Sequence, residues 1–264
     1  DDDSDDDSLG LKTMLLLFIE EAKLRKLTGL CDDDDDMDMA TARVIKARKP
    51  KPNYFVAIRV SDLCIHSRVQ TVQDTVVSHD KRLEPALVPL ETLHLTLLVI
   101  HLENEEQIEK AKKILHQCRT EILKHVLPSS AFTLKLKGLD YFTDGWQPQA
   151  VLFVKPVGKE GIKILKNVAD VVRDTFTRQG IPSIDTREFH PHVTVINLNK
   201  APNLKKEGIS KIPEESFATC RDLDFGEEQV SSLHLCSMGP EMAQDGFYNC
   251  VAKIDFEADD EINN

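Results

Sequence analysis

Two histidine–threonine pairs are the residues in this sequence best suited to chemistry. His94 and Thr96 lie in the segment ETLHLTLLVI, and His192 and Thr194 lie in FHPHVTVINL. Both segments are apolar and predict strands, in which residues two positions apart point to the same face. Each segment therefore presents one imidazole and one hydroxyl side by side, while the flanking leucines and valines point the other way into a core.

An imidazole beside a hydroxyl, present twice, suits metal-free chemistry at a phosphodiester. In-line displacement at phosphorus needs a base on the entering oxygen and an acid on the leaving oxygen. Histidine can do either because its unperturbed pKa, about 6.5, lies near working pH. Threonine hydroxyls can donate hydrogen bonds to the non-bridging phosphate oxygens. We therefore interpret His94 and His192 as candidate catalytic residues, and Thr96 and Thr194 as candidate phosphate-binding residues.

The two pairs occupy matching places in a repeated unit. A strand-like run, a helix at 62–79 and a proline-bearing loop precede His94, and a second strand, a helix at 160–179 and a loop precede His192. The offset is 39 residues from Phe55 to His94 and 40 from Leu152 to His192. A period of about a hundred residues indicates a duplicated lobe, not a solenoid. Two such lobes facing each other would bring both histidines to one cleft.

Other periodic segments complete an α+β domain that we place at 51–256. They predict a helix at 104–126, strands at 131–142 and 150–157, and a closing strand pair at 230–238 and 247–256. Before this domain we expect a flexible acidic region, 1–50, with a short helix at 9–30 that could contact a protein partner. After it we expect an acidic tail, 257–264.

Charge and cysteine usage narrow the possible ligands and compartments. The net charge of −12 is concentrated at the two ends, and residues 39–254 carry +3. A mildly basic body fits a small nucleotide or an RNA end better than a nucleic-acid duplex. The six cysteines show no CxxC pair or zinc spacing, which is typical of reduced thiols in a cytoplasmic or nuclear protein. No apolar run is long enough to cross a membrane, and no secretion signal is evident.

At these residues the sequence resembles the 2H phosphoesterase superfamily, the LigT-like RNA ligases and cyclic phosphodiesterases. Their hallmark is two His-x-Thr/Ser motifs on strands of a two-lobed α+β fold. The resemblance is closer to the branch of the A-kinase anchoring protein 7 central domain and the leukocyte receptor cluster member 9 C-terminal domain. It spans about 52–256. The segments that carry it are PNYFVAIRV, LHLTLLVI, FHPHVTVINL, FGEE and LCSM.

The resemblance implies a pseudo-twofold fold of antiparallel-rich sheets flanked by helices, no cofactor, and a nucleotide or RNA-end ligand. The implied reaction is opening of a 2′,3′-cyclic phosphate or cleavage of a 2′,5′ linkage as in 2-5A. The sequence leaves open which histidine is the base. If the cyclic phosphate is opened to a 2′-phosphate, we expect His192 to activate water and His94 to protonate the leaving oxygen.

Aromatic side chains could stack on the base of a nucleotide. Phe142 matches an aromatic position of the resembled family, and Tyr54 and Phe55 are further candidates, although alternation allows only one of these two to line the cleft. Tyr141 and Trp146 are weaker candidates. Two cations flank the second motif, at positions 187 and 200, and we interpret them as solvated surface charges.

Two alternatives remain open. His190 and His192 share a strand parity and could bind a metal, although no third ligand stands at a convincing spacing and Pro191 interrupts the strand. Survival of activity in a chelator would exclude that metal site. The domain could also be an anchoring or scaffold module that binds AMP or CMP without turnover. Turnover of a cyclic nucleotide distinguishes this module from an enzyme.

Overall fold

The computed structural model describes residues 50–127, 130–143 and 149–257. All of them belong to a compact unit that spans Lys49–Asn264. The predicted helix at 9–30 and most of the predicted acidic tail lie outside the described residues, and so does Trp146.

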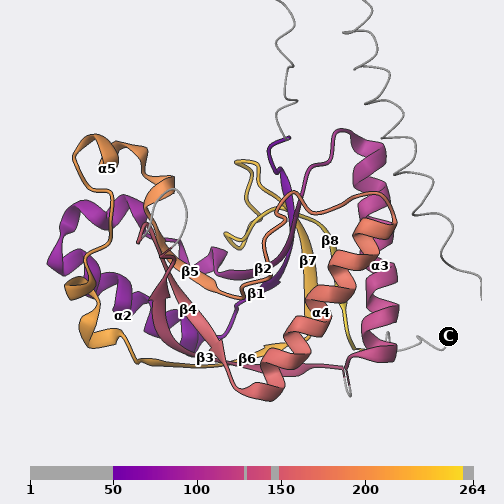
Figure 1. Ribbon diagram of the computed structural model, residues 1–264, viewed down its shortest axis with the longest axis horizontal. Helices are drawn as coiled ribbons and strands as arrows, with labels where there is room; N and C mark the ends of the chain where they lie inside the picture. The colour runs from indigo at the N-terminus through magenta and orange to yellow at the C-terminus, as the bar shows by residue number, and fades with distance from the viewer. Residues whose placement is uncertain (1–49, 128–129, 144–148, 258–264) are drawn as a thin grey trace, which may run out of the picture. The chain divides into compact units, whose positions relative to one another are not determined.

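One eight-stranded sheet organises the described part of the chain, and all its strand pairs are antiparallel. The strand order is β6-β3-β4-β5-β2-β1-β7-β8, so two four-stranded halves meet where β5 lies beside β2 (Figure 1). The strands are β1 Tyr54–Arg59, β2 His94–Ile100, β3 Phe132–Tyr141, β4 Val151–Val157, β5 Val193–Asn197, β6 Asp224–Val230, β7 Ser232–Ser237 and β8 Cys250–Asp255.

Four α-helices accompany this sheet within the described residues, and none of them is long and apolar enough to span a membrane. Asp62 and Asn104 are the N-cap residues of the first two of these helices. Their side-chain oxygens accept hydrogen bonds from backbone N–H groups in the first turn. The α-helices are α2 Leu63–His79, α3 Glu105–His125, α4 Lys159–Arg178 and α5 Pro202–Lys206, and the 3₁₀ turns are η1 Lys81–Ala86, η2 Leu90–Thr92, η3 Leu198–Lys200, η4 Glu214–Ser216 and η5 Ala218–Cys220.

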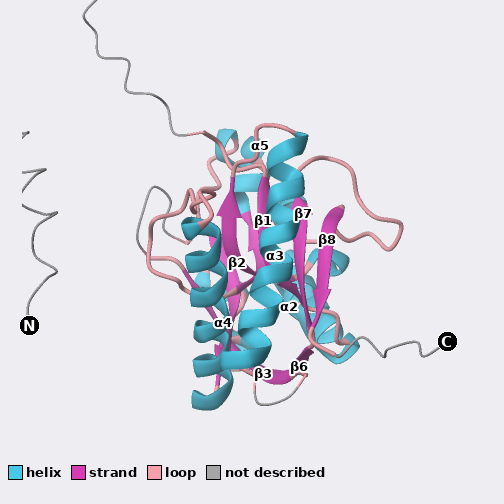
Figure 2. Cartoon of the chain, turned by 90° about the vertical axis from the view of Figure 1, so that its right-hand side faces the viewer, coloured by secondary structure: helices cyan, strands magenta, loops and turns pink. Residues whose placement is uncertain are grey.

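The three long helices pack against the sheet and bury its apolar side chains. Val69 of α2, Leu115 of α3 and Val168 of α4 belong to the same core cluster as the strand residues Leu95 and Val193. Figure 2 shows α3 and α4 side by side over the strands. Because these strand positions face the helices, the alternate positions of β2 and β5 form the opposite face.

The element order confirms the repeat predicted from the sequence. The unit β1–α2–β2 in one half corresponds to β4–α4–β5 in the other. The two predicted lobes share one continuous sheet, because β5 pairs with β2. The predicted closing strands also pair, as β7 with β8.

The sequence pattern did not predict β6 or α5. Strand β6 has a buried Phe225 and a buried Glu228 three positions apart, which breaks the alternation of a regular strand. A register shift in the β3–β6 pairing and the positive φ of Gly226, 107°, account for the odd spacing. Glu228 is only 4% exposed and accepts three 3.0 Å hydrogen bonds, from the Ser61 N–H, the Ser61 hydroxyl and the Asp62 N–H.

Candidate active site

The two motifs meet at the junction of the two halves of the sheet. The single β2–β5 register pair sets Leu95 opposite Val193, and both side chains are fully buried on the helix face. Their chain neighbours therefore project from the opposite face. This places both histidine–threonine pairs on one face of adjacent strands, as the alternation and the repeat predicted.

The antiparallel register also determines which side chains are neighbours. Extending the register by one position sets His94 beside Thr194 and Thr96 beside His192. All four residues are half-buried. Each imidazole therefore has its own threonine along the strand and the other motif's threonine across the strand pair. A phosphate bound over the junction could reach hydroxyls from both motifs.

Both imidazoles are held in the same way. Nδ1 of His94 lies 2.7 Å from the Thr92 carbonyl oxygen, and Nδ1 of His192 lies 2.7 Å from the His190 carbonyl oxygen. A carbonyl oxygen can only accept, so Nδ1 donates in each case. This bond fixes the tautomer and leaves Nε2 of each ring as the atom that takes or gives a proton.

Each imidazole also lies against two aromatic rings, which fix its orientation. The contacts on the two sides are closely matched. The ring centroid distances are 5.0 Å to Phe55 and 5.3 Å to Tyr248 for His94, and 5.0 Å to Phe142 and 5.3 Å to Phe153 for His192.

Burial makes both rings difficult to protonate. Loss of hydration lowers the pKa of His94 to about 4; the bond to the Thr92 carbonyl opposes this shift, while the positive charge of Lys200, and that of His192 when it is protonated, adds to it. Loss of hydration also lowers the pKa of His192, aided by His190 and Arg187 and opposed by the bond to the His190 carbonyl. Both rings are therefore neutral at pH 7 in the ligand-free protein.

The structure corrects two of the three base-stacking predictions. Tyr54 packs against the helix-side core, so its ring is on the wrong face of β1. Phe55 is on the site face but is only 2% exposed, so its ring supports His94 and has no free face for a base. Phe142 is half-buried beside His192 and stays a prediction. The hydroxyl of Tyr141 contacts a carboxylate oxygen of Glu214.

The sequence interpretation missed Phe153 and Tyr248. Phe153 was detectable, because it precedes His192 by 39 residues, the same offset that separates Phe55 from His94. Aligning the repeat on its phenylalanines would have identified it. Tyr248 comes from the connection between β7 and β8, and no local pattern in the sequence relates this loop to His94.

The two flanking cations differ in the structure. Arg187 binds Asp185 through two bonds, of 2.9 and 2.7 Å, and its side chain is 86% exposed, which agrees with a solvated surface charge. The Nζ of Lys200 lies 3.4 Å from the Tyr248 hydroxyl, and its charge acts on His94. Lys200 is exposed too, which agrees with a solvated charge, and its place beside Tyr248 also makes it a candidate contact of the site.

No group of three His, Cys, Asp or Glu side chains in the described ranges is arranged to hold a metal ion. The rings of His190 and His192 have centroids 6.3 Å apart. The metal site considered for this pair therefore has no third ligand among these residues.

The fold is that of a LigT-like protein. The structure of Escherichia coli LigT complexed with 3′-AMP aligns with a TM-score of 0.50 at 17% identity, covering 77% of this chain and 97% of that one. At this identity the likeness concerns the fold.

Sequence comparison assigns the chain to a narrower group than the likeness of fold does. Residues 52–256 match the family model described as "AKAP7 2′5′ RNA ligase-like domain", so this chain belongs to that family, within the 2H phosphoesterase superfamily. Human A-kinase anchor protein 7 isoform gamma is 30% identical over 217 residues, which are 82% of this chain and 61% of that protein. The RNA 2′,3′-cyclic phosphodiesterase of Aquifex aeolicus is 30% identical over 147 residues, 56% of this chain and 69% of that enzyme. The chain thus spans less than two thirds of the human relative.

Proposed function

We propose that this chain is a metal-independent phosphodiesterase acting on RNA 3′ ends or small nucleotides. Its scissile group would be a 2′,3′-cyclic phosphate or a 2′,5′ linkage such as that of 2-5A. The observation that carries the proposal is the matched pair of imidazoles, each with Nδ1 held by a carbonyl oxygen 2.7 Å away and Nε2 left to exchange a proton. Similarity to the Aquifex cyclic phosphodiesterase supports it.

In this proposal His94 and His192 are the acid–base pair, and Thr96 and Thr194 hold the phosphate. For a cyclic phosphate, one neutral ring removes a proton from water as its oxygen bonds to phosphorus. The bond from phosphorus to one ribose oxygen breaks, and the other ring, protonated, gives that oxygen a proton. The two hydroxyls donate to the non-bridging oxygens, where the transition state accumulates charge.

The pKa values of the His94 and His192 imidazoles affect which of the two can act as the acid. Protonating His94 is costly in the ligand-free protein, since its pKa is about 4. The assignment expected from the sequence, with His94 as acid, therefore requires the bound phosphate to raise the pKa of His94 above that of His192. The bound phosphodiester carries one negative charge, and an opposite charge at close range raises the pKa of an imidazole by about 1–3 units.

Two further residues would contact the substrate. Lys200 would place its ammonium near the phosphate, because its Nζ lies 3.4 Å from the hydroxyl of Tyr248, whose ring packs against His94. Phe142 would stack on the base, since its half-buried ring lies beside His192. Stacking of this kind is worth about 1–3 kcal/mol per base and tolerates different bases.

The second candidate is a nucleotide-binding anchoring or scaffold module without turnover. Two observations favour it. Both rings are neutral at pH 7 before a ligand arrives, so neither is ready to act as an acid. The relative that covers 82% of this chain is named as an anchor protein. A module of this kind would bind AMP or CMP on the same residues.

The test is a digestion of defined substrates in the presence of EDTA. We expect turnover of a 2′,3′-cyclic mononucleotide or of a 2′,5′-linked adenylate, and none of a 3′,5′-linked control. End-group analysis then reads whether the product carries a 2′- or a 3′-phosphate. Binding of AMP with no turnover of either substrate would reject the enzyme in favour of the module, and loss of turnover in EDTA would reject metal independence.

Partner and compartment remain predictions from the sequence. A protein partner for the 9–30 segment and a cytoplasmic or nuclear location both rest on residues or composition that the described structure does not test. Pull-down with the full chain and with residues 49–264 would test the partner, and imaging of the tagged protein would test the location.

A further inference from the structure

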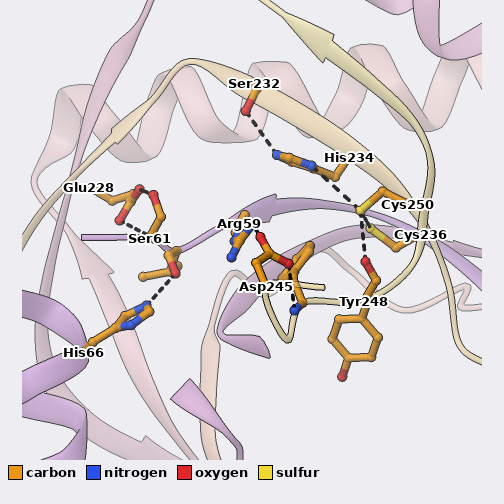
Figure 3. Close-up of polar contacts among 12 residues, drawn as sticks. Arg59, Ser61, His66, Glu228, Ser232, His234, Cys236, Asp245, Tyr248 and Cys250 are labelled. Atoms are coloured by element: carbon orange, nitrogen blue, oxygen red, sulfur yellow. Dashed lines mark hydrogen bonds and ion pairs between the residues drawn. The ribbon is translucent and has the colours of Figure 1, made fainter. Parts of the chain in front are cut away.

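Two cysteines face each other across the last two strands of the sheet. The β7–β8 register sets Cys236 opposite Cys250, with their Sγ atoms 2.7 Å apart (Figure 3). Both are free thiols. Cys236 is fully buried and Cys250 is half-buried, so a small reagent can reach only Cys250 directly.

The surroundings favour the thiolate of Cys250. The Cys236 thiol donates toward it, Nδ1 of His234 lies 3.9 Å from its Sγ, and the Arg59 guanidinium adds positive charge, all of which lower the pKa of Cys250. The hydrogen bond with Cys250, burial and the neighbouring negative charge all raise the pKa of Cys236. The thiolate is the reactive form of cysteine, so the more accessible sulfur is also the more nucleophilic one.

We propose that Cys236 and Cys250 form a dithiol modification site that a peroxide converts to a disulfide. The Cys250 thiolate attacks one peroxide oxygen, the O–O bond breaks, and with one proton from solvent the products are a Cys250 sulfenic acid and water. The sulfur of Cys236 then attacks the sulfenic sulfur, loses its proton and releases a second water. The two cysteines are oxidised together by two electrons, and the peroxide is reduced.

The geometry suits this bond. A disulfide needs sulfurs about 2.05 Å apart and Cβ atoms about 3.5–4.5 Å apart, and directly opposed residues on antiparallel strands come close to that separation. The sulfurs are already closer than van der Waals contact, so they need to approach by only a fraction of an ångström to bond. A thiol or a reductase that reopens the disulfide would reverse the modification.

The two cysteines lie next to the aromatic residues that pack against His94. Cys236 packs in one small cluster with Phe55 and Phe247, and the Cys250 sulfur lies 3.4 Å from the Tyr248 carbonyl oxygen. Phe55 and Tyr248 are the two rings that flank His94. The modification site is therefore adjacent to the support of His94 and lies in the half of the sheet that does not carry His192.

Mass spectrometry of the full chain tests the proposal without any activity assay, so it is independent of the proposed function. The protein is treated with hydrogen peroxide, its remaining thiols are alkylated, and it is digested. We expect a Cys236–Cys250 cross-linked peptide that has lost two hydrogen masses and disappears on reduction. The exposed Cys64, on α2, serves as the control and should remain available for alkylation.

Two variants resolve the order of the steps. In Cys236→Ser, peroxide should stop at a Cys250 sulfenic acid that dimedone traps. In Cys250→Ser, Cys236 should stay reduced and react no faster than Cys64. Full alkylation of both cysteines after peroxide, or a disulfide that links either to another cysteine, would overturn the proposal even if neither variant folds, because both results are read on the wild type.

Discussion

The pH dependence of stability that arises from protonation of His94 tests the burial of this ring in the site. Burial moves its pKa from 6.5 to about 4, which corresponds to about 3.4 kcal/mol against the charged form. Because the folded pKa lies below the unfolded pKa, the unfolded chain binds more protons between pH 6.5 and 4. Stability from this residue is therefore complete above pH 6.5 and is lost as the pH falls toward 4.

The perturbation is His94→Asn, whose side-chain amide can still donate to the Thr92 carbonyl but cannot titrate. Linkage predicts that wild type loses about 2.6 kcal/mol more than the variant between pH 7.5 and pH 4.5. Urea unfolding at the two pH values measures the difference. His192→Asn serves as the matched variant for the other ring and should show a smaller difference. Equal pH dependence in wild type and His94→Asn would refute a buried, neutral His94.

Nitrogen NMR of the two imidazoles directly tests whether they are neutral and which ring nitrogen carries the proton. Both rings should carry the proton on Nδ1 at pH 7, and His94 should still be neutral at pH 5. Repeating the titration with bound 2′-AMP identifies the acid as the ring whose pKa rises more. An Nε2–H tautomer in either ring would contradict the carbonyl anchors.

Three further predictions concern single residues and the pair. Replacing Glu228 by Ala should lower the free energy of unfolding, measured by urea unfolding, by about 2–4 kcal/mol, because three hydrogen-bond donors lose their acceptor. The control Glu227→Ala, at an exposed position, should change this free energy little. Lys200→Ala should weaken binding of a nucleotide monophosphate roughly twofold to fivefold by calorimetry, and the exposed Lys205→Ala should not; equal effects would remove Lys200 from the site. The pH–rate profile should be bell-shaped, with apparent pKa values that belong to the pair; activity that does not vary from pH 5 to 9 counts against acid–base catalysis by two histidines.

The strand period explains why the core of the site was predictable. A period of two assigns His94 and Thr96 to one face from sequence alone, and the repeat makes the same assignment for His192 and Thr194. The long helices were predictable for a similar reason, since their apolar positions recur at the helical period. These signals are local, and the structure preserves them.

The other parts of the site depend on contacts that local patterns do not encode. Tyr248 reaches His94 from a loop whose position follows from the β7–β8 pairing. The alternation in β6 is broken at Gly226, which concealed that strand. The pKa of His94 depends on burial by neighbours distant in the sequence, so no spacing rule could provide it. Alternation separated Tyr54 from Phe55, but which of them faces the site, and the burial of Phe55 beside His94 and Tyr248, could be known only from the packing.

The most direct test of the central claim is the turnover number for a 2′,3′-cyclic mononucleotide in wild type, His94→Ala, His192→Ala and the double variant. If the two rings act as one acid–base unit, each single variant should lose roughly 10²–10⁴-fold, and the double variant should be about as slow as the slower single one. Single variants that retain wild-type turnover, with circular dichroism confirming their fold, would contradict the account.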